Sequence, residues 1–265
     1  MQVNEPARAA FMEYVSNYDM DDIMVSSKVS HTMRVAQFCR QIAESLNLTD
    51  SDVELAWMTG LLHDFGRFEQ IKRFGTFIDS HSVDHAELGA DLLFKEGEID
   101  RFVKAGLPVK EFKLTETVIR LHNKLLIPDD LDDRTRTFAQ ILRDADKIDI
   151  FRVMDEMSFE QRAGKSLKLF IEKEEASAEV MEYVYLHRCI PRAVVQSEFE
   201  GNLSHICLAF ELVYEKSRRL AIEQGYLKKL FLTKDDQGNL IWNEKETRQL
   251  EQIHSEVEKC WQTEI

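Results

Sequence analysis

The sequence predicts an all-helical fold, and three observations support that prediction. The chain has 265 residues but only 10 glycines and 4 prolines, which are too few interruptions for a meander of short strands. Apolar residues recur every three or four positions over long stretches, as they do in helices that bury one face. The sequence holds no internal repeat and no low-complexity tract, so an ordinary packed core of helices is expected.

The individual helices are predicted from this spacing and from signals at their ends. Pro6 suits the first turn of a helix, and Thr49 precedes acidic residues in the manner of a capped helix start. Gly66 is expected to end the helix that begins there, and residues 67–84 are expected to form a long irregular loop of the kind that often serves function. The predicted helices cover about 6–18, 22–46, 49–63, 84–93, 111–124, 132–154, 202–224 and 244–261.

The part of the chain beyond Asp155 is also predicted to be mostly helical. A turn with a small hairpin is expected near residues 235–242. No linker separates the two parts of the sequence. Residues 161–265 are therefore expected to be C-terminal helices that pack on the same domain as residues 1–160.

The composition is that of an ordinary globular domain, with 44% hydrophobic and 31% charged residues. The formal net charge of −14 argues against a nucleic-acid polymer as a partner, because both molecules would be strongly negative. A small phosphorylated substrate is compatible with this charge, since bound divalent metals reverse the local field.

The cysteines and the start of the chain predict a cytoplasmic protein. The four cysteines show no C-x-x-C spacing, which excludes a zinc knuckle or a redox motif and favours unpaired thiols. The first residues lack the apolar stretch of a signal peptide, and no apolar run approaches membrane-spanning length. No membrane partner is expected, and no feature indicates an oligomeric state.

Four of the eight histidines are predicted to lie at inward-facing positions or helix ends, namely His31, His63, His85 and His122. Any one of them alone is best explained as a hydrogen-bonded core residue. Together with Asp64, they are costly polar groups to bury unless a cation compensates. Imidazole and carboxylate suit Zn, Mn, Fe or Ni better than Ca, so a divalent transition metal is expected.

A further aspartate ligand is expected from residues 143–149, which include three aspartates. Apolar residues between positions 138 and 145 define the buried stripe of this helix. Asp149 falls nearest to the centre of the stripe, whereas Asp144 and Asp146 flank it on opposite sides. Helical phase therefore leaves the choice of ligand open, and a solvated acidic face is the simpler alternative.

The order of these residues resembles the signature of the HD superfamily, His … His-Asp … Asp. The resemblance spans about residues 25–155, and it selects Asp146 over the other two aspartates. The similar local contexts are Lys28–Ala36 around the first histidine, Leu61–Arg67 around the His-Asp pair and Ala145-Asp146-Lys147 at the final aspartate. The resemblance implies an HD-domain helical bundle whose metal ligands are His31, His63, Asp64 and Asp146.

Two further segments resemble HD proteins that hold two metals, such as the cyclic-dinucleotide phosphodiesterases. They are Asp84–Ala90, which contains His85, and Leu121–Asn123, which contains His122. The resemblance implies a second ion on these histidines, with Asp64 as the bridging carboxylate. After His122 the chain reads Asn-Lys-Leu-Leu-Ile-Pro instead of the Gly-Tyr-Pro of that branch, which argues against cyclic-dinucleotide cleavage.

The function implied by the resemblance is metal-dependent hydrolysis of a small phosphate ester or nucleotide by metal-activated water. One or two divalent ions are implied, and Mn, Fe, Ni, Zn and Co are all compatible. Asp64 would act in catalysis, while Arg67 and Lys147 would hold phosphate oxygens or else be ordinary surface cations. Three alternatives stay open: a di-iron oxygenase of the same fold, a nucleotide-binding module without turnover, and a helical scaffold with hydrogen-bonded histidines.

Overall fold

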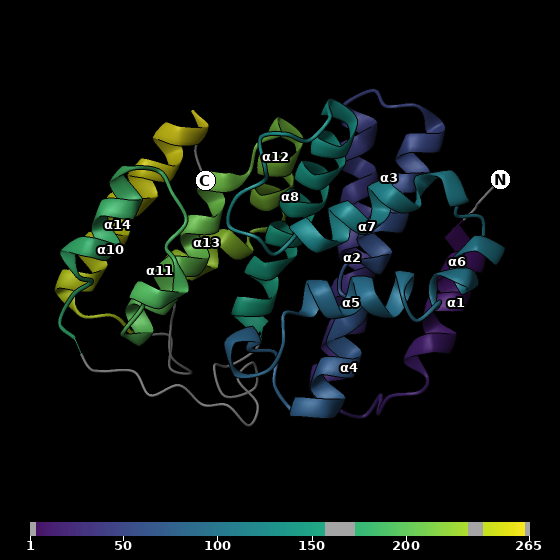
Figure 1. Cartoon of the computed structure of the whole chain (residues 1–265). Helices are drawn as coiled ribbons and strands as arrows, with labels where there is room; N and C mark the ends of the chain where they lie inside the picture. Colours follow the sequence, from purple (N-terminus) through teal and green to yellow (C-terminus); the bar gives the residue numbers. More distant parts are fainter. Residues whose placement is uncertain (1–3, 157–172, 233–240, 263–265) are drawn as a thin grey trace. The chain divides into compact units, whose positions relative to one another are not determined.

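The computed structural model describes residues 4–156, 173–232 and 241–262, and all regular elements in these ranges are helices (Figure 1). The prediction of an all-α fold is confirmed. The described residues divide into two compact units, the first with residues 4–149 and the second with 150–156, 173–232 and 241–262. The packing of the C-terminal helices on the first part stays a prediction. None of the helices in the described ranges is long and apolar enough to cross a membrane.

The first unit contains the segments in which the metal ligands are predicted. Its helices are α1 (Asn4–Val15), α2 (Ile23–Ser45), α3 (Asp50–Leu62), α4 (Phe65–Phe74), η1 (Asp79–His81), α5 (His85–Phe94), α6 (Ile99–Lys104), η2 (Val109–Glu111), α7 (Phe112–Leu121) and most of α8 (Asp133–Glu156). The predicted helix starts are confirmed at α2 and α3, where the side chains of Asp22 and Thr49 accept backbone hydrogen bonds as N-caps. Asp84 caps α5 in the same way.

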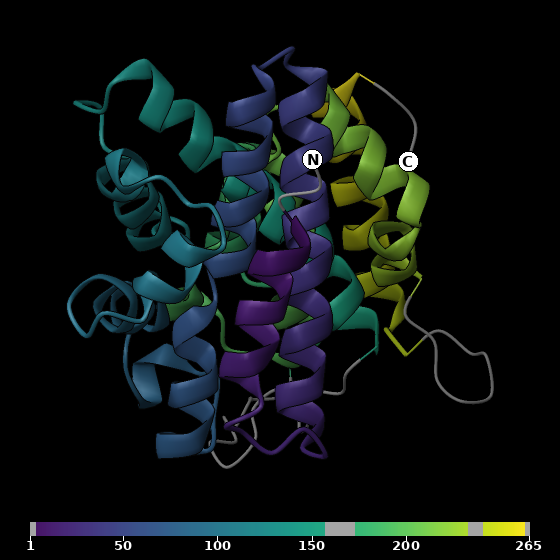
Figure 2. The same cartoon turned by 90° about the vertical axis from the view of Figure 1, so that its right-hand side faces the viewer.

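The helices α2 and α3 lie side by side as an antiparallel pair (Figure 2). Gly60 of α3 permits their close approach, since a Cβ atom there would lie 2.7 Å from the Cα of Ala36 and 2.9 Å from the Sγ of Cys39. The backbones can therefore come together at Ala36 and Gly60, and farther along the pair the ring centroids of His31 and His63 lie 5.3 Å apart. This contact places the first two predicted ligands next to each other.

The prediction that Gly66 ends a helix is wrong, and the loop predicted from Arg67 to Asp84 is confirmed only after α4, which occupies residues 65–74. Gly66 lies in the first turn of α4, whose own end is Gly75 in the left-handed conformation, with φ of 65°. Gly66 is required by a tertiary contact instead, because a Cβ atom there would lie 2.4 Å from the carbonyl oxygen of His85 and 2.5 Å from the nitrogen of Gly89. The contact between α4 and α5 brings His85 towards Asp64.

The second unit is also built from helices in the described ranges. They are α10 (Ala178–Tyr185), η3 (Arg192–Val194), α11 (Glu198–Ile206), η4 (Cys207–Glu211), α12 (Glu215–Gln224), α13 (Tyr226–Phe231) and α14 (Glu244–Trp261), together with the last residues of α8. The helix predicted over 244–261 is confirmed, and Asn243 caps it with a capping box. Figure 1 shows α10 beside α14.

One predicted helix of this unit is interrupted, because residues 202–224 do not form a continuous helix. The chain leaves α11 at Ile206, passes through η4 and starts α12 only at Glu215. The buried side chains of Cys207, Ala209 and Leu212 anchor the break in the core, so tertiary packing overrides the helical spacing of the sequence. The predicted hairpin near 235–242 lies mostly outside the described residues. No disulfide bond joins any of the four cysteines, all of which lie in the described ranges, as predicted.

Candidate metal centre

The six predicted ligands come from five parts of the first unit and converge in one buried cluster. His31 lies on α2, His63 and Asp64 join α3 to α4, His85 opens α5, His122 follows α7, and Asp146 lies on α8. Their ligand atoms form three groups within which all atoms lie no more than 4.8 Å apart: His31 with His63 and Asp64, His63 with His122 and Asp146, and Asp64 with His85 and His122. The cluster was expected from the sequence, and the structure assembles it.

Asp64 stands at the centre of this cluster, with one carboxylate oxygen facing each pair of histidines. Its Oδ2 lies 3.5 Å from Nε2 of both His31 and His63. Its Oδ1 lies 3.4 Å from Nε2 of His85 and 3.7 Å from Nε2 of His122. Asp146 adds a second carboxylate on the first side, where its Oδ1 is 3.1 Å from Nε2 of His31. Asp64 therefore has the position expected of a bridging carboxylate.

Each histidine is held from outside the cluster by its other ring nitrogen. The Nδ1 of His63 lies 2.7 Å from the carbonyl oxygen of Gly60, and that of His122 lies 2.6 Å from the carbonyl oxygen of Ile119. A carbonyl can only accept, so both Nδ1 atoms carry the hydrogen and both Nε2 atoms keep a lone pair. His31 and His85 are held through Nδ1 by carboxylates, at 2.9 Å from Asp149 and 2.6 Å from Asp79 respectively.

The result is a convergence of electron-rich atoms that a bound cation would relieve. The Nε2 atoms of His85 and His122 face each other at 3.0 Å. The Nε2 atoms of His31 and His63 are buried and have no hydrogen bond of good geometry in the described part of the chain. Nitrogen lone pairs and carboxylate oxygens without sulfur are the donor set of a divalent transition metal. The residues present therefore fit such an ion.

The electrostatics of the cluster favour the metal-binding forms of Asp64 and His85, whereas at His31 the effects of burial and Lys28 are outweighed by Asp146 and Asp149, which raise its pKa. Burial raises the pKa of Asp64, but the Lys28 ammonium and His63 outweigh this and hold it well below its usual range. Burial and then Arg67 lower the pKa of His85 to about 4, against the opposing effect of Asp79. At neutral pH Asp64 is ionised and His85 is neutral, which are the states that bind metals.

Two carboxylates that hold ligand histidines were not assigned this role from the sequence. Asp149 is fully buried and accepts from His31 on one oxygen and from Arg34 on the other. Its burial agrees with the helical phase, which placed it nearest to the centre of the stripe. Asp79 lies in the region predicted as a loop, where no sequence signal marks it. It accepts from His85, Arg67 and Gln70 and so ties this segment to α4 and α5.

Arg143 is a third residue whose role was not predicted from the sequence. Its side chain is buried, and its Nη1 donates to the carbonyl oxygens of Leu121, His122 and Lys124, while its Nη2 donates to that of Leu125. These carbonyls include those left without a partner at the end of α7. Arg143 of α8 therefore holds the segment that contains His122.

The remaining predicted residues differ in their placement. Arg67 lies at the cluster, with its Nε 3.6 Å from Oδ1 of Asp64 and its Nη1 donating to Phe77 and Asp79. Lys147 is buried on α8 directly after Asp146, and its role stays a prediction. Asp144 is fully buried and accepts from Gln140, and it belongs to none of the three ligand groups.

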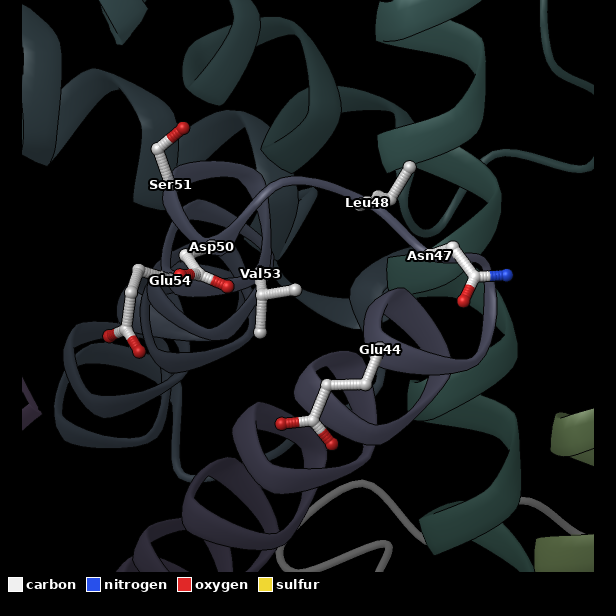
Figure 3. A pocket seen from close by; sticks show the side chains of 7 residues that line it. All are labelled: Glu44, Asn47, Leu48, Asp50, Ser51, Val53 and Glu54. Carbon is white, nitrogen blue, oxygen red and sulfur yellow. The ribbon is translucent and has the colours of Figure 1, made fainter.

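A separate hollow lies at the turn between α2 and α3, and Figure 3 shows the side chains around it. Its lining residues are Glu44, Asn47, Leu48, Asp50, Ser51, Val53 and Glu54. Three of them are acidic, and none belongs to the buried cluster. The hollow offers no histidine and no cationic side chain, so it lacks the donor set of the cluster.

The comparisons with known proteins agree with this geometry. A family model described as the HD domain matches residues 29–150, a range that contains all six predicted ligands. Neither the curated proteins nor the solved structures gave a match to this chain.

Proposed function

The chain contains an HD domain over residues 29–150, and on that premise we propose that it is a metal-dependent phosphohydrolase. Its substrate is a small phosphate ester or a nucleotide. The observation that supports this proposal is the convergence of four histidine Nε2 atoms on Asp64 and Asp146, with the lone pairs of His63 and His122 directed inward. A bound divalent transition ion supplies hydroxide at neutral pH and neutralises charge on phosphoryl oxygens.

The proposed ligands fall into two sets that share Asp64. His31, His63, Asp64 and Asp146 would hold one ion. His85 and His122 would hold a second ion together with Asp64. Mn, Fe, Ni, Zn and Co are all compatible with these donors.

The chain's own residues also bind and orient the substrate. The Nη1 of Arg67 is held by Phe77, Gln70 and Asp79, whereas its buried Nε has no hydrogen bond in the described ranges. We assign this Nε as a donor to a phosphoryl oxygen and keep Lys147 as a second candidate. The net charge of −14 supports a small substrate rather than a nucleic-acid polymer. A cytoplasmic location remains part of the proposal.

The test combines metal analysis with a substrate panel. Purified native protein should carry transition metal and hydrolyse at least one member of a panel of phosphomonoesters, nucleotides and cyclic nucleotides. A His63→Ala, Asp64→Ala double variant should lose both properties. His122→Ala should bind one ion fewer than the native protein, while His187→Ala in the second unit serves as the matched control.

Three results would contradict the proposal. Equal, near-zero metal in the native protein and the double variant would point to a helical scaffold. Oxygen consumption without hydrolysis of any phosphate ester would favour the di-iron oxygenase, which shares this ligand set. Nucleotide binding by the metal-loaded protein without turnover would favour a binding module.

A further inference from the structure

Lys28 occupies a position beside the cluster that the proposed ligand sets do not explain. It lies on α2, one turn before His31, and its Nζ is 2.8 Å from Oδ2 of Asp64. The same Nζ lies 5.4 Å from the centre of the Phe77 ring. The sequence places Lys28 on the inward stripe of its helix without indicating a role.

Lys28 and Arg67 together give each oxygen of Asp64 one positive neighbour. Lys28 stands at Oδ2, and the Nε of Arg67 stands 3.6 Å from Oδ1. The guanidinium of Arg67 also lies 5.5 Å from the centre of the Phe77 ring, so one aromatic ring supports both cations. The two cations therefore flank the central carboxylate, with Phe77 as their common support.

The exposure of the side chains shows from which side a substrate reaches the cluster. Lys28 and Asp146 are each 16% exposed and Arg67 is 14% exposed, whereas the ligand histidines and Asp64 are 5% exposed or less. Solvent therefore reaches Lys28, Arg67 and Asp146 more readily than the histidines. An anionic group that enters from solvent would meet these three side chains before it reaches the histidines.

A positive charge at this place is unfavourable for a metal ion and favourable for an anion. An ammonium near a divalent cation weakens the binding of that cation by direct repulsion. An ammonium has three donors, of which Asp64 takes one, so further donors remain for phosphoryl oxygens. Removal of this charge should therefore change metal affinity and phosphate affinity in opposite directions, and measuring both tests the role of Lys28.

We propose that Lys28 is a phosphate-binding residue of this site and contacts a phosphoryl oxygen beside Oδ2 of Asp64, whereas Arg67 stands beside Oδ1. The proposal rests on the proposed function. It adds a substrate contact that belongs to neither ligand set. Together the two cations fit a group with at least two anionic oxygens, as found in a phosphate ester.

The experiment measures inorganic phosphate binding and metal affinity in the full-length protein. Lys28→Met should weaken phosphate binding by about tenfold or more, while metal affinity stays the same or rises. Lys28→Arg should recover much of the phosphate affinity, because it restores the positive charge. Lys72→Met is the matched control, since Lys72 also lies over an aromatic ring, that of Tyr18, but is largely exposed. It should change neither quantity.

Two outcomes would overturn the proposal. Phosphate binding that is equal in the native protein and in Lys28→Met would remove Lys28 from the substrate site. Loss of metal together with loss of phosphate binding in Lys28→Met would show that Lys28 merely holds Asp64 in place. Failure of the proposed function looks different, because the native protein would then carry no metal or hydrolyse no ester. In that case the phosphate titration of the native protein and of Lys28→Met still shows whether Lys28 binds phosphate.

Discussion

The two units each bury a polar centre, and the two centres are built in opposite ways. In the second unit Glu200 is fully buried, and its oxygens accept from Lys173 at 2.9 Å and from the backbone nitrogens of Ser177, Gln196 and Ser197 at 3.0, 2.7 and 3.2 Å. In the first unit the Nε2 atoms of His31 and His63 are buried without a hydrogen bond of good geometry in the described part of the chain. The oxygens of Glu200 have their hydrogen-bond partners within the protein, whereas the Nε2 atoms of the two histidines are left for a ligand.

The difference shows how a structural centre is distinguished from a functional one. Every oxygen of Glu200 has two donors, so the carboxylate stabilises the fold that surrounds it. The histidines are also held firmly, but only through Nδ1, and this leaves their Nε2 atoms directed at one another and at two carboxylates. Burial of groups that repel one another is costly unless a further partner binds. The comparison therefore predicts different consequences when each centre is altered.

The largest effect is expected from the carboxylates proposed as ligands. Asp64→Ala and Asp146→Ala should each lower the rate of phosphate-ester hydrolysis by about a thousandfold or more, because the affinity for the metal would fall and the metal-bound hydroxide would be misplaced. Asp144→Ala is the control within the same helix and should retain much more activity. Initial rates under metal saturation give the comparison. Full activity in Asp146→Ala would remove that residue from the ligand set.

A smaller effect is expected at Asp149, which holds a histidine rather than a metal. Asp149→Asn keeps the shape of the side chain but removes the charge beside His31 and Arg34. Metal affinity should fall by about 10- to 100-fold, the usual effect of altering a group behind a ligand. Competition with a chromophoric chelator measures this affinity. A complete loss of metal in Asp149→Asn, with metal retained in Asp146→Ala, would exchange the roles of the two aspartates.

The smallest effect is expected at Glu200, and it should concern stability alone. Glu200→Gln should lower the free energy of unfolding by about 1–3 kcal/mol, because Lys173 and three backbone donors lose an ionised acceptor. Metal content should not change. Denaturant titration measures the difference, with Glu251→Gln on the exposed face of α14 as the control. A change in metal content would contradict the separation of the two centres.

The pH dependence of this difference gives a second check on Glu200. Burial raises its pKa, but the backbone of Ser177 and the Lys173 ammonium outweigh burial and lower the pKa from 4.5 to about 2. The folded pKa lies below the unfolded one, so the ion contributes its full stability above about pH 4.5 and loses it as the pH falls towards 2. The stability difference between the native protein and Glu200→Gln should therefore shrink over this range. A difference that stays constant would contradict the assignment.

The helices that the sequence predicted well are those with local end signals. Asp22, Thr49 and Asn243 each satisfy backbone nitrogens within three residues, so their effect is visible in the chain itself. The helical spacing failed where a distant segment decided the outcome. Gly66 meets Gly89, which is 23 positions away in the sequence, and the break after Ile206 is set by packing in the core.

In the candidate site, too, some features follow from the local sequence and others only from tertiary contacts. The order and the local contexts of the histidines and aspartates predicted the ligand set, because residue types and their neighbours are properties of the sequence. Helical phase predicted the burial of Asp149 but could not tell a buried ligand from a buried partner of a ligand. That distinction depends on which side of His31 each carboxylate approaches, and phase along one helix does not contain it.

The sequence by itself determined the all-helical class, the starts of the main helices and the residue types of the metal cluster. Each of these depends on spacing or capping within a few residues. Only the tertiary structure decided that Asp79, Arg143 and Lys28 meet the cluster. Asp79 contacts His85 from an irregular segment, and Arg143 contacts the backbone carbonyl oxygen of His122. Lys28 contacts Asp64, which is 36 positions away in the sequence. Such contacts form when α2, α5, α7 and α8 pack together, because packing in three dimensions selects partners that no local pattern specifies.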